Sequence, residues 1–163
     1  MSMIGNYLKL SSEQLATLAR DPSAVEEFAY PSDGDVPADA MDIDKSWHLV
    51  HYLLTGESWG GEAPLKDAVL GGRELAGTDT GYGPYRYLTA ADVRATSRAL
   101  TDLTADALWA RFDVERVNTA QIYPTPWAGD DGDRDYVTSN YEALRKYFFE
   151  AVVSGQGMLL YLG

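Results

Sequence analysis

The hydrophobic pattern divides the chain into a few short strands and a larger number of helices. Alternating apolar residues predict a strand from Met3 to Leu10. The run from Met158 to Leu162 is apolar throughout, as is typical of a central strand, and a third short strand is expected over 85–88. Helical spacing and N-cap residues predict helices over about 12–20, 22–28, 44–55, 90–100 and 140–153, with short ones after Thr104 and Asp113. These elements predict an α+β fold with a single compact domain, 1–163, in which a small sheet of short strands from both termini and the middle packs against several helices.

Three segments interrupt this pattern and are expected to be irregular. Residues 31–40 combine proline and glycine with aspartate, and residues 60–83 contain seven glycines. Residues 129–135 are acidic, and we expect them to form a turn before a helix whose capping box is Ser139 with Glu142. These loops connect the predicted elements without forming an interdomain linker.

Composition and charge exclude several classes of protein. The 163 residues include no cysteine, which excludes a thiol nucleophile, disulfides and cysteine-based metal sites. Thirteen Lys and Arg against 25 Asp and Glu give a net charge of −12, which repels nucleic acid and anionic membranes. The same charge favours a cation or a basic protein partner, and it also serves solubility. Because the sequence shows no signal-peptide pattern and no apolar run long enough to cross a membrane, we expect a cytoplasmic protein.

Both histidines of the chain lie on the predicted helix 44–55. At about 100° per residue, the leucines of this helix gather on one side. The opposite side carries the polar residues Asp44, His48, His51 and Tyr52. We therefore expect the histidines to point away from the core. The i,i+4 spacing would let the Asp44 carboxylate orient the His48 imidazole, as carboxylates do for general bases and for metal-bound histidines.

Three uses of this polar face stay open. Its histidines could bond only to backbone or water, or the face could bind a ligand or a partner. His48 and His51 could also share a metal with Asp44 or another carboxylate. Beyond that pair of candidate ligands, the residues predict no cofactor.

A second concentration of unusual residues lies in and just after the glycine-rich segment 77–84. Tyr82, Tyr85 and Tyr87 surround a Gly-Pro turn, and Arg86 is the nearest cation. Such a loop could form the wall of a cleft, with Tyr hydroxyls and Arg as its polar contacts. The alternative is that Tyr85 and Tyr87 simply pack one face of the strand. The segment matches neither of the glycine patterns that bind nucleotides.

Two other motifs lack the context that their chemistry needs. Residues 56–60 match G-x-S-x-G, but a helix precedes them and no histidine follows Ser58, which excludes an α/β-hydrolase triad. Residues 131–142 have the acidic spacing of an EF-hand, but Tyr136 stands where the loop requires glycine. A solvated acidic turn is therefore expected there.

Segments spread along almost the whole chain match one known family in order. They are Met3–Tyr7, Asp42–Lys45, Trp47-His48, His51, Leu53–Gly56, Leu70–Gly72, Gly81–Pro84, Arg86–Thr89, Ile122–Pro124, Trp127 and Gly155-Gln156. In these segments the chain resembles the YfbM-like family of uncharacterised bacterial proteins, which carry a domain of unknown function. The acidic segment 129–135 matches least well. The resemblance implies a single α+β domain in the bacterial cytoplasm, and it implies no mechanism.

The sequence as a whole predicts a non-catalytic binding or interaction protein. The expected binding residues are Asp44, His48, His51, Tyr52, Tyr82, Tyr85 and Arg86. The expected partner is a protein or a small-molecule ligand. The alternative is a metal-assisted or His-dependent hydrolase, with His48 and Asp44 as catalytic candidates and His51 as co-ligand or acid. That alternative requires a third protein group to converge on the histidines inside a pocket.

Overall fold

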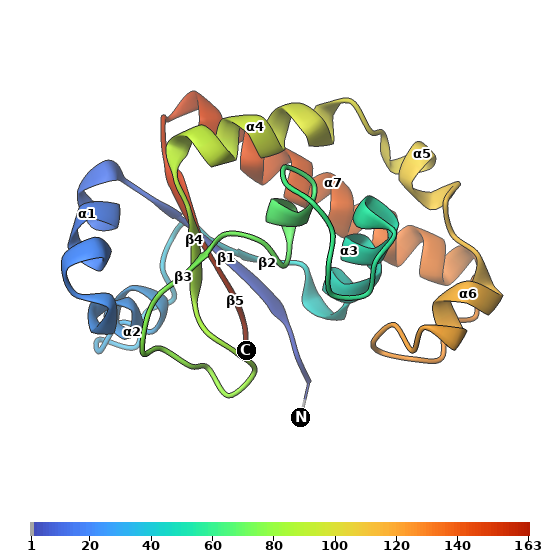
Figure 1. Cartoon of the computed structure of the whole chain (residues 1–163), viewed down its shortest axis with the longest axis horizontal. Coiled ribbons are helices and arrows are strands. Elements are labelled where there is room, and N and C mark those ends of the chain that lie inside the picture. The colour runs from blue at the N-terminus through green and yellow to red at the C-terminus, as the bar shows by residue number, and fades with distance from the viewer. Residues whose placement is uncertain (1) are drawn as a thin grey trace.

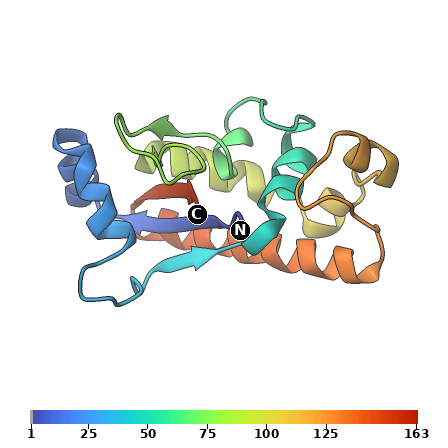
Figure 2. The ribbon, with the colours of Figure 1, turned by 90° about the horizontal axis from the view of Figure 1, so that it is seen from below.

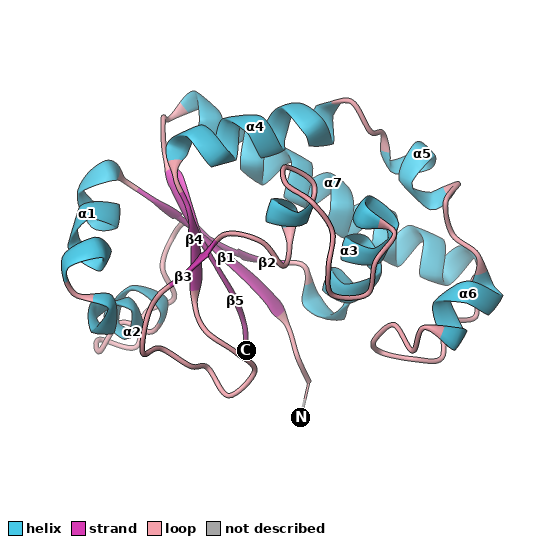
Figure 3. Ribbon diagram, in the orientation of Figure 1, coloured by secondary structure: helices cyan, strands magenta, loops and turns pink. Residues whose placement is uncertain are grey.

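The structure is a computed structural model that describes residues 2–163. These residues form five strands and seven α-helices (Figures 1 and 3). Their bounds are β1 (Gly5–Leu10), α1 (Ser12–Arg20), α2 (Val25–Ala29), β2 (Ala40–Asp42), α3 (Trp47–Thr55), β3 (Arg73–Glu74), β4 (Arg86–Leu88), α4 (Ala90–Thr101), α5 (Ala105–Trp109), α6 (Val114–Thr119), α7 (Asp131–Val153) and β5 (Gly157–Leu162). Short 3-10 helices cover Pro22–Ala24, Asp44–Ser46 and Lys66–Ala68. The predicted α+β class is confirmed.

All five strands form one antiparallel sheet in the order β2-β1-β5-β4-β3. The two terminal strands pair over their whole length, with Tyr7 opposite Leu160, and Figure 2 shows the two chain ends close together. β4, from the middle of the chain, pairs with the other edge of β5. The prediction that 158–162 forms the central strand is confirmed, and it follows from burial on both faces.

Helices cover both faces of the sheet and create two hydrophobic cores. Figure 1 shows α1 and α2 on one side of the sheet and α3 to α7 on the other. Because neighbouring side chains of a strand point to opposite faces, Leu160 packs into the larger core and Leu159 into the smaller one. Each face of β5 therefore fixes a different group of helices.

The longest helix begins earlier than the sequence pattern indicates. α7 begins at Asp131 because the Asp130 side chain accepts a hydrogen bond from the amide of Asp133, which makes Asp130 the N-cap. The predictions of an acidic turn over 129–135 and of a cap at Ser139 are wrong. Acidic side chains in the first turn interact favourably with the positive end of the helix dipole and stabilise the helix start. This acidic run therefore begins a helix.

The remaining helix boundaries agree well with capping chemistry. Ser11 and Gln14 form the predicted capping box of α1, and Thr89 forms a similar box with Asp92 at the start of α4. Thr104 caps α5 as predicted. The three-residue strand β2 lies within and just beyond the region predicted as loop, and too few residues pair there to produce a visible alternation.

Replacing Thr89 with alanine is expected to lower the free energy of unfolding by about 1 kcal/mol, because the amide of Asp92 loses its acceptor. Thr89→Ser keeps the hydroxyl and should retain most of the stability. Urea denaturation of the two variants beside the parent protein measures the difference. Equal losses in both variants would show that the threonine methyl group, and not the cap, is responsible.

Among residues 2–163, no helix combines the length and the apolar character needed to cross a lipid bilayer.

Candidate functional site

Both histidines are buried, contrary to the polar surface expected from the helical spacing. His48 and His51 are almost fully shielded from solvent. The leucines of α3 are buried in the core, and the loop that follows the helix contacts His48 through the carbonyl of Ser58. Figure 3 shows this loop beside α3. The helical pattern identified the two sides correctly, but it could not reveal that the following loop folds back over the second one.

His48 joins two loops to α3. Its Nε2 donates to the carbonyl of Ser58, and its Nδ1 accepts from the amide of Tyr123, both at 2.9 Å. This pattern requires the neutral imidazole with its proton on Nε2. Burial lowers the pKa of His48, opposed in part by the Ser58 carbonyl. Since both ring nitrogens are occupied, His48 serves as a structural connection in this conformation.

His51 lies deeper and keeps one nitrogen without a partner. Its Nδ1 is the buried side-chain polar atom that finds no hydrogen bond among the described residues. Burial lowers the pKa of His51 to about 4, with smaller contributions in the same direction from His48, Lys66 and Arg86 and an opposing one from the Gly60 carbonyl. The ring is therefore neutral at physiological pH.

The predicted pairing of Asp44 with His48 is wrong. The two residues form no ion pair within 4 Å, and Asp44 instead accepts a hydrogen bond from the hydroxyl of Tyr136 at 2.8 Å. The i,i+4 geometry presupposed one α-helix from residue 44. Residues 44–46 form a 3-10 turn, with Asp44 at a positive φ of 48°, and the α-helix begins only at Trp47. The carboxylate consequently lies off the helical register.

The proposed metal ligands do not converge. No group of three His, Asp or Glu side chains within residues 2–163 is placed to hold a metal ion. The acidic EF-hand-like spacing over 131–142 belongs to the regular helix α7, whose backbone cannot wrap around an ion as a calcium loop does.

Two of the predicted tyrosines lie away from the histidines. Tyr85 is buried in the smaller core, and its hydroxyl lies 3.4 Å from the Glu26 carboxylate. Of the two predictions for Tyr85, packing in the core is therefore the one that the structure shows. Tyr52 lies on the partly exposed side of α3, where it lines a groove with Arg116 of α6. Neither tyrosine contributes to the pocket described next.

Arg86 is a buried cation without an ion pair. Only 8% of its surface is exposed, and Nη1 donates to the carbonyls of Val69 and Gly71 at 2.8 and 2.7 Å. None of the five ion pairs found in the described part of the chain involves Arg86. Burial lowers the pKa of Arg86, opposed in part by Tyr7, Glu74 and Asp67. A guanidinium stays protonated in proteins, so its charge persists.

A pocket of about 210 Å³ opens at Arg86. Its lining consists of Trp59, Leu70, Glu74, Tyr82, Gly83, Pro84, Arg86 and Leu162. The Nε and Nη2 groups of Arg86 have no acceptor elsewhere in residues 2–163 and are the donors that remain for a ligand. Trp59 and Tyr82 contribute the aromatic walls. The pocket thus combines one buried positive charge with apolar surface.

The glycine-rich loop holds Tyr82 in place. The Asp79 carboxylate accepts hydrogen bonds from the amides of Gly81 and Gly83, and both glycines have positive φ values, at 93° and 117°. Such values suit glycine because a Cβ is strained there. The hydroxyl of Thr80 donates to the carbonyl of Leu162 and ties the loop to β5. These hydrogen bonds fix the glycine-rich segment 77–84, which forms one wall of the pocket.

Trp59 links this pocket to the histidine helix. Its ring lies 4.5 Å from the His48 ring, which in turn stacks on Trp47 at 4.7 Å. Trp59 itself is 61% exposed. Trp59 therefore connects α3 with the Tyr82–Arg86 loop. The sequence identified these two segments as candidate sites but gave no contact between them. The one available signal for Trp59 was an aromatic residue in a glycine-rich loop.

The fold and the pocket define a class of small α+β proteins in which one antiparallel sheet lies between two groups of helices. The chain belongs to the family described as "Domain of unknown function (DUF1877)", whose model matches residues 1–161. The resemblance to the YfbM-like family is confirmed.

Known relatives support both the family and the fold. Protein YfbM of Escherichia coli (strain K12) is 32% identical over 130 residues, which cover 76% of this chain and 74% of that protein. A crystal structure of a protein of unknown function, YfbM from Escherichia coli, superposes with a TM-score of 0.77 at 24% identity and covers 98% of this chain and 99% of that chain. Neither description assigns an activity.

Proposed function

We propose that the protein is a non-catalytic binding protein whose ligand is a small anion with a flat apolar part. The Arg86 pocket is its binding site. The observation that carries the proposal is the burial of Arg86 without a carboxylate partner. A buried charge that lacks a direct ion pair is costly, and an anion in the pocket would offset part of that cost.

The free edge of the guanidinium suits an oxyanion that can accept two hydrogen bonds at once, such as a carboxylate. Nη1 is fixed by the carbonyls of Val69 and Gly71, which orients the planar group. The Nε and Nη2 groups left over form one edge of the fork, and a carboxylate can accept from both at once. Glu74 lines the same pocket, but it is exposed and forms no ion pair with Arg86, so its carboxylate does not occupy the free edge of the guanidinium.

The aromatic walls indicate the apolar part of the ligand. The exposed Trp59 ring lies against the His48 imidazole, which is held by two hydrogen bonds, and it offers a flat surface. A ligand that stacks there costs little side-chain entropy, because few torsion angles of the protein become fixed. Tyr82 and Pro84 supply the other contacts. A planar ring attached to the carboxylate would fill the space between them.

The absence of an accessible acid–base pair favours binding over catalysis. His48 uses both ring nitrogens on backbone groups, and Asp44 is bonded to Tyr136. The hydrolase alternative required these residues to converge on a third group, and their positions give it no support. Glu74 and Arg86 are the charged groups of the pocket, and neither is paired with a nucleophile there.

Three probes of matched shape and different charge test the proposal. Calorimetry is expected to show that benzoate binds, whereas benzamide and benzamidine bind at least about tenfold more weakly at this site, because a charge-assisted hydrogen bond contributes roughly 1.5–3 kcal/mol. Trp59→Ala and Arg86→Lys should both weaken benzoate. Phe149→Ala removes another exposed aromatic outside the pocket and should leave binding unchanged.

Arg86 also supports the backbone, so each variant is first compared with the parent by thermal unfolding. Trp59→Ala keeps the claim testable if Arg86→Lys fails to fold, because Trp59 is mostly exposed. Equal affinity for benzoate and benzamide, or no effect of Trp59→Ala, would contradict the proposal.

A further inference from the structure

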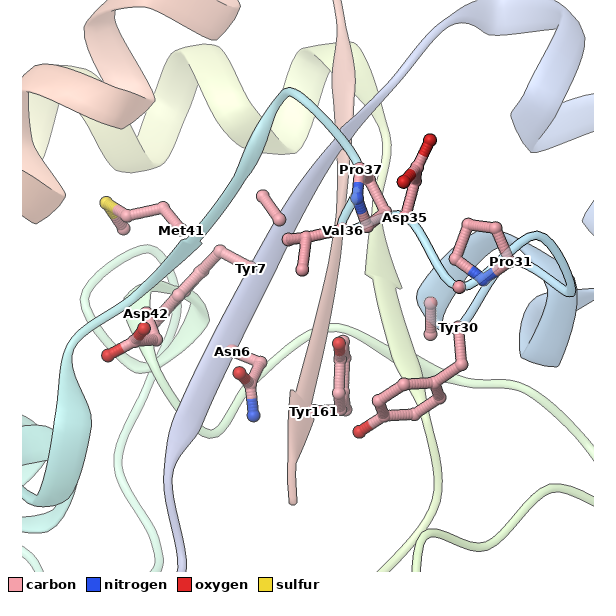
Figure 4. Close-up of a pocket in the computed structure, with 13 residues that line it drawn as sticks. Asn6, Tyr7, Tyr30, Pro31, Asp35, Val36, Pro37, Met41, Asp42 and Tyr161 are labelled. Carbon is pink, nitrogen blue, oxygen red and sulfur yellow. The ribbon is translucent and has the colours of Figure 1, made fainter.

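A second and larger pocket lies on the opposite face of the sheet. Its volume is about 320 Å³, and it opens between β2, β1, the end of β5 and the loop 31–37 (Figure 4). Tyr161 and Leu162 are neighbours on β5 and point to opposite faces, so the first lines this pocket and the second lines the Arg86 pocket. The two cavities are therefore separate sites that share one strand end.

Two tyrosine rings form one side of this pocket. Tyr30 and Tyr161 meet edge to face, with ring centroids 6.0 Å apart and an interplanar angle of 70°. Tyr161 is only 8% exposed, and its hydroxyl lies within hydrogen-bonding range of the Tyr30 side chain. Figure 4 shows both side chains beside the open space between β5 and the loop. Their ring surfaces are therefore the part that a ligand can contact.

Three other side chains of the pocket offer hydrogen-bond acceptors. Asn6 donates one amide hydrogen to the carbonyl of Ile4, and its oxygen stays available. Asp42 uses one carboxylate oxygen for the amide of Asp44 and keeps the second. Asp35 adds a further carboxylate at the rim.

The charges of the lining all have one sign. Asp35 and Asp42 are negative, and neither lysine nor arginine lines the pocket. The five ion pairs of the described chain leave both carboxylates unpaired. A ligand that donates hydrogen bonds and carries positive charge would satisfy both free carboxylates.

We propose that this pocket is a second binding site, specific for an organic cation of the guanidinium or ammonium type. The cation would lie against the faces of Tyr30 and Tyr161, where the ring quadrupole attracts positive charge. Its N–H groups would donate to Asp42 and to the Asn6 oxygen. The same chemistry is offered by a free amine and by the Arg or Lys side chain of a peptide. This site depends on none of the residues of the Arg86 pocket.

Benzamidine is the probe for the cation, with benzamide as its uncharged match. Calorimetry should show benzamidine binding that Asp42→Asn weakens several-fold and that Asp35→Asn with Asp42→Asn weakens by about tenfold or more. Asp39→Asn is the matched control, because Asp39 is an exposed acid next to the pocket that does not line it. Arg86→Lys should leave benzamidine binding unchanged.

Blocked peptides distinguish the two sources of the cation. Acetyl-Gly-Arg-Gly-amide binding more tightly than benzamidine, with the same dependence on Asp42, would indicate a peptide side chain. Benzamidine binding with no peptide binding would indicate a free small cation, and both results support the proposal. Asn substitution keeps side-chain size and acceptor, so folding should persist. Failure of benzamidine to bind, equal binding of benzamide, or equal loss in Asp39→Asn would overturn it.

Discussion

Phe148→Ala is expected to lower the free energy of unfolding by about 3–5 kcal/mol, the usual loss for an aromatic side chain deleted from a packed core. Phe148 is fully buried on α7, with its ring 6.3 Å from the Tyr7 ring of β1 in an edge-to-face arrangement. It therefore joins the longest helix to a strand of the sheet. Removing it leaves a cavity that neither element can close without moving the other.

The next residue supplies the control. Phe149 has the same side chain on the same helix but is 59% exposed, so Phe149→Ala should change stability by no more than about 0.5 kcal/mol. Urea denaturation of both variants measures the contrast. Similar losses in the two variants would show that α7 packs on the sheet through a different face.

Acidification is expected to remove roughly 3 kcal/mol of stability through His51. The folded pKa of His51 is about 4, because burial disfavours the charged ring, whereas the unfolded chain titrates near 6.5. Between these values the unfolded chain binds a proton that the folded chain does not. The stabilisation is therefore complete above pH 6.5 and is lost as the pH falls to about 4. His48, whose pKa is also lowered by burial, acts in the same direction.

Comparison of the parent with His51→Gln isolates this effect from the carboxylates, which also titrate at low pH. Glu150, whose pKa Lys9 lowers, is common to both proteins. Urea denaturation at pH 7, 6, 5 and 4 should give a shallower decline for His51→Gln, even though the variant is less stable at pH 7. Parallel declines would show that His51 does not titrate with a lowered pKa.

Local chemistry predicted most of the fold. The capping groups of α1, α4 and α5 are short-range interactions, so the sequence alone locates those helix starts. The wholly apolar strand β5 likewise predicted its own central position. The start of α7 differs from the prediction, because Asp130 caps the helix and the capping-box spacing at Ser139 lies inside it.

The candidate site was predictable only in part. Tyr82 and Arg86 were identified from an unusual cluster around a Gly-Pro turn, and both line the pocket. The burial of His48 and His51 depends on the loop after α3, which lies over the helix through contacts that helical periodicity does not encode. The role of Trp59 depends on the same loop. Long-range packing thus determined which of the predicted residues are accessible.

The most direct test of the account follows the Arg86 guanidinium itself. In side-chain nitrogen–proton NMR spectra, the Nε–H signal of Arg86 is assigned by its loss in Arg86→Lys and is then followed while benzoate is added. The account predicts that this signal shifts and saturates at the affinity measured by calorimetry, and that benzamide needs at least about tenfold higher concentration for the same shift. An Arg86 signal that stays fixed at saturating benzoate would contradict the claim that this buried cation binds the ligand.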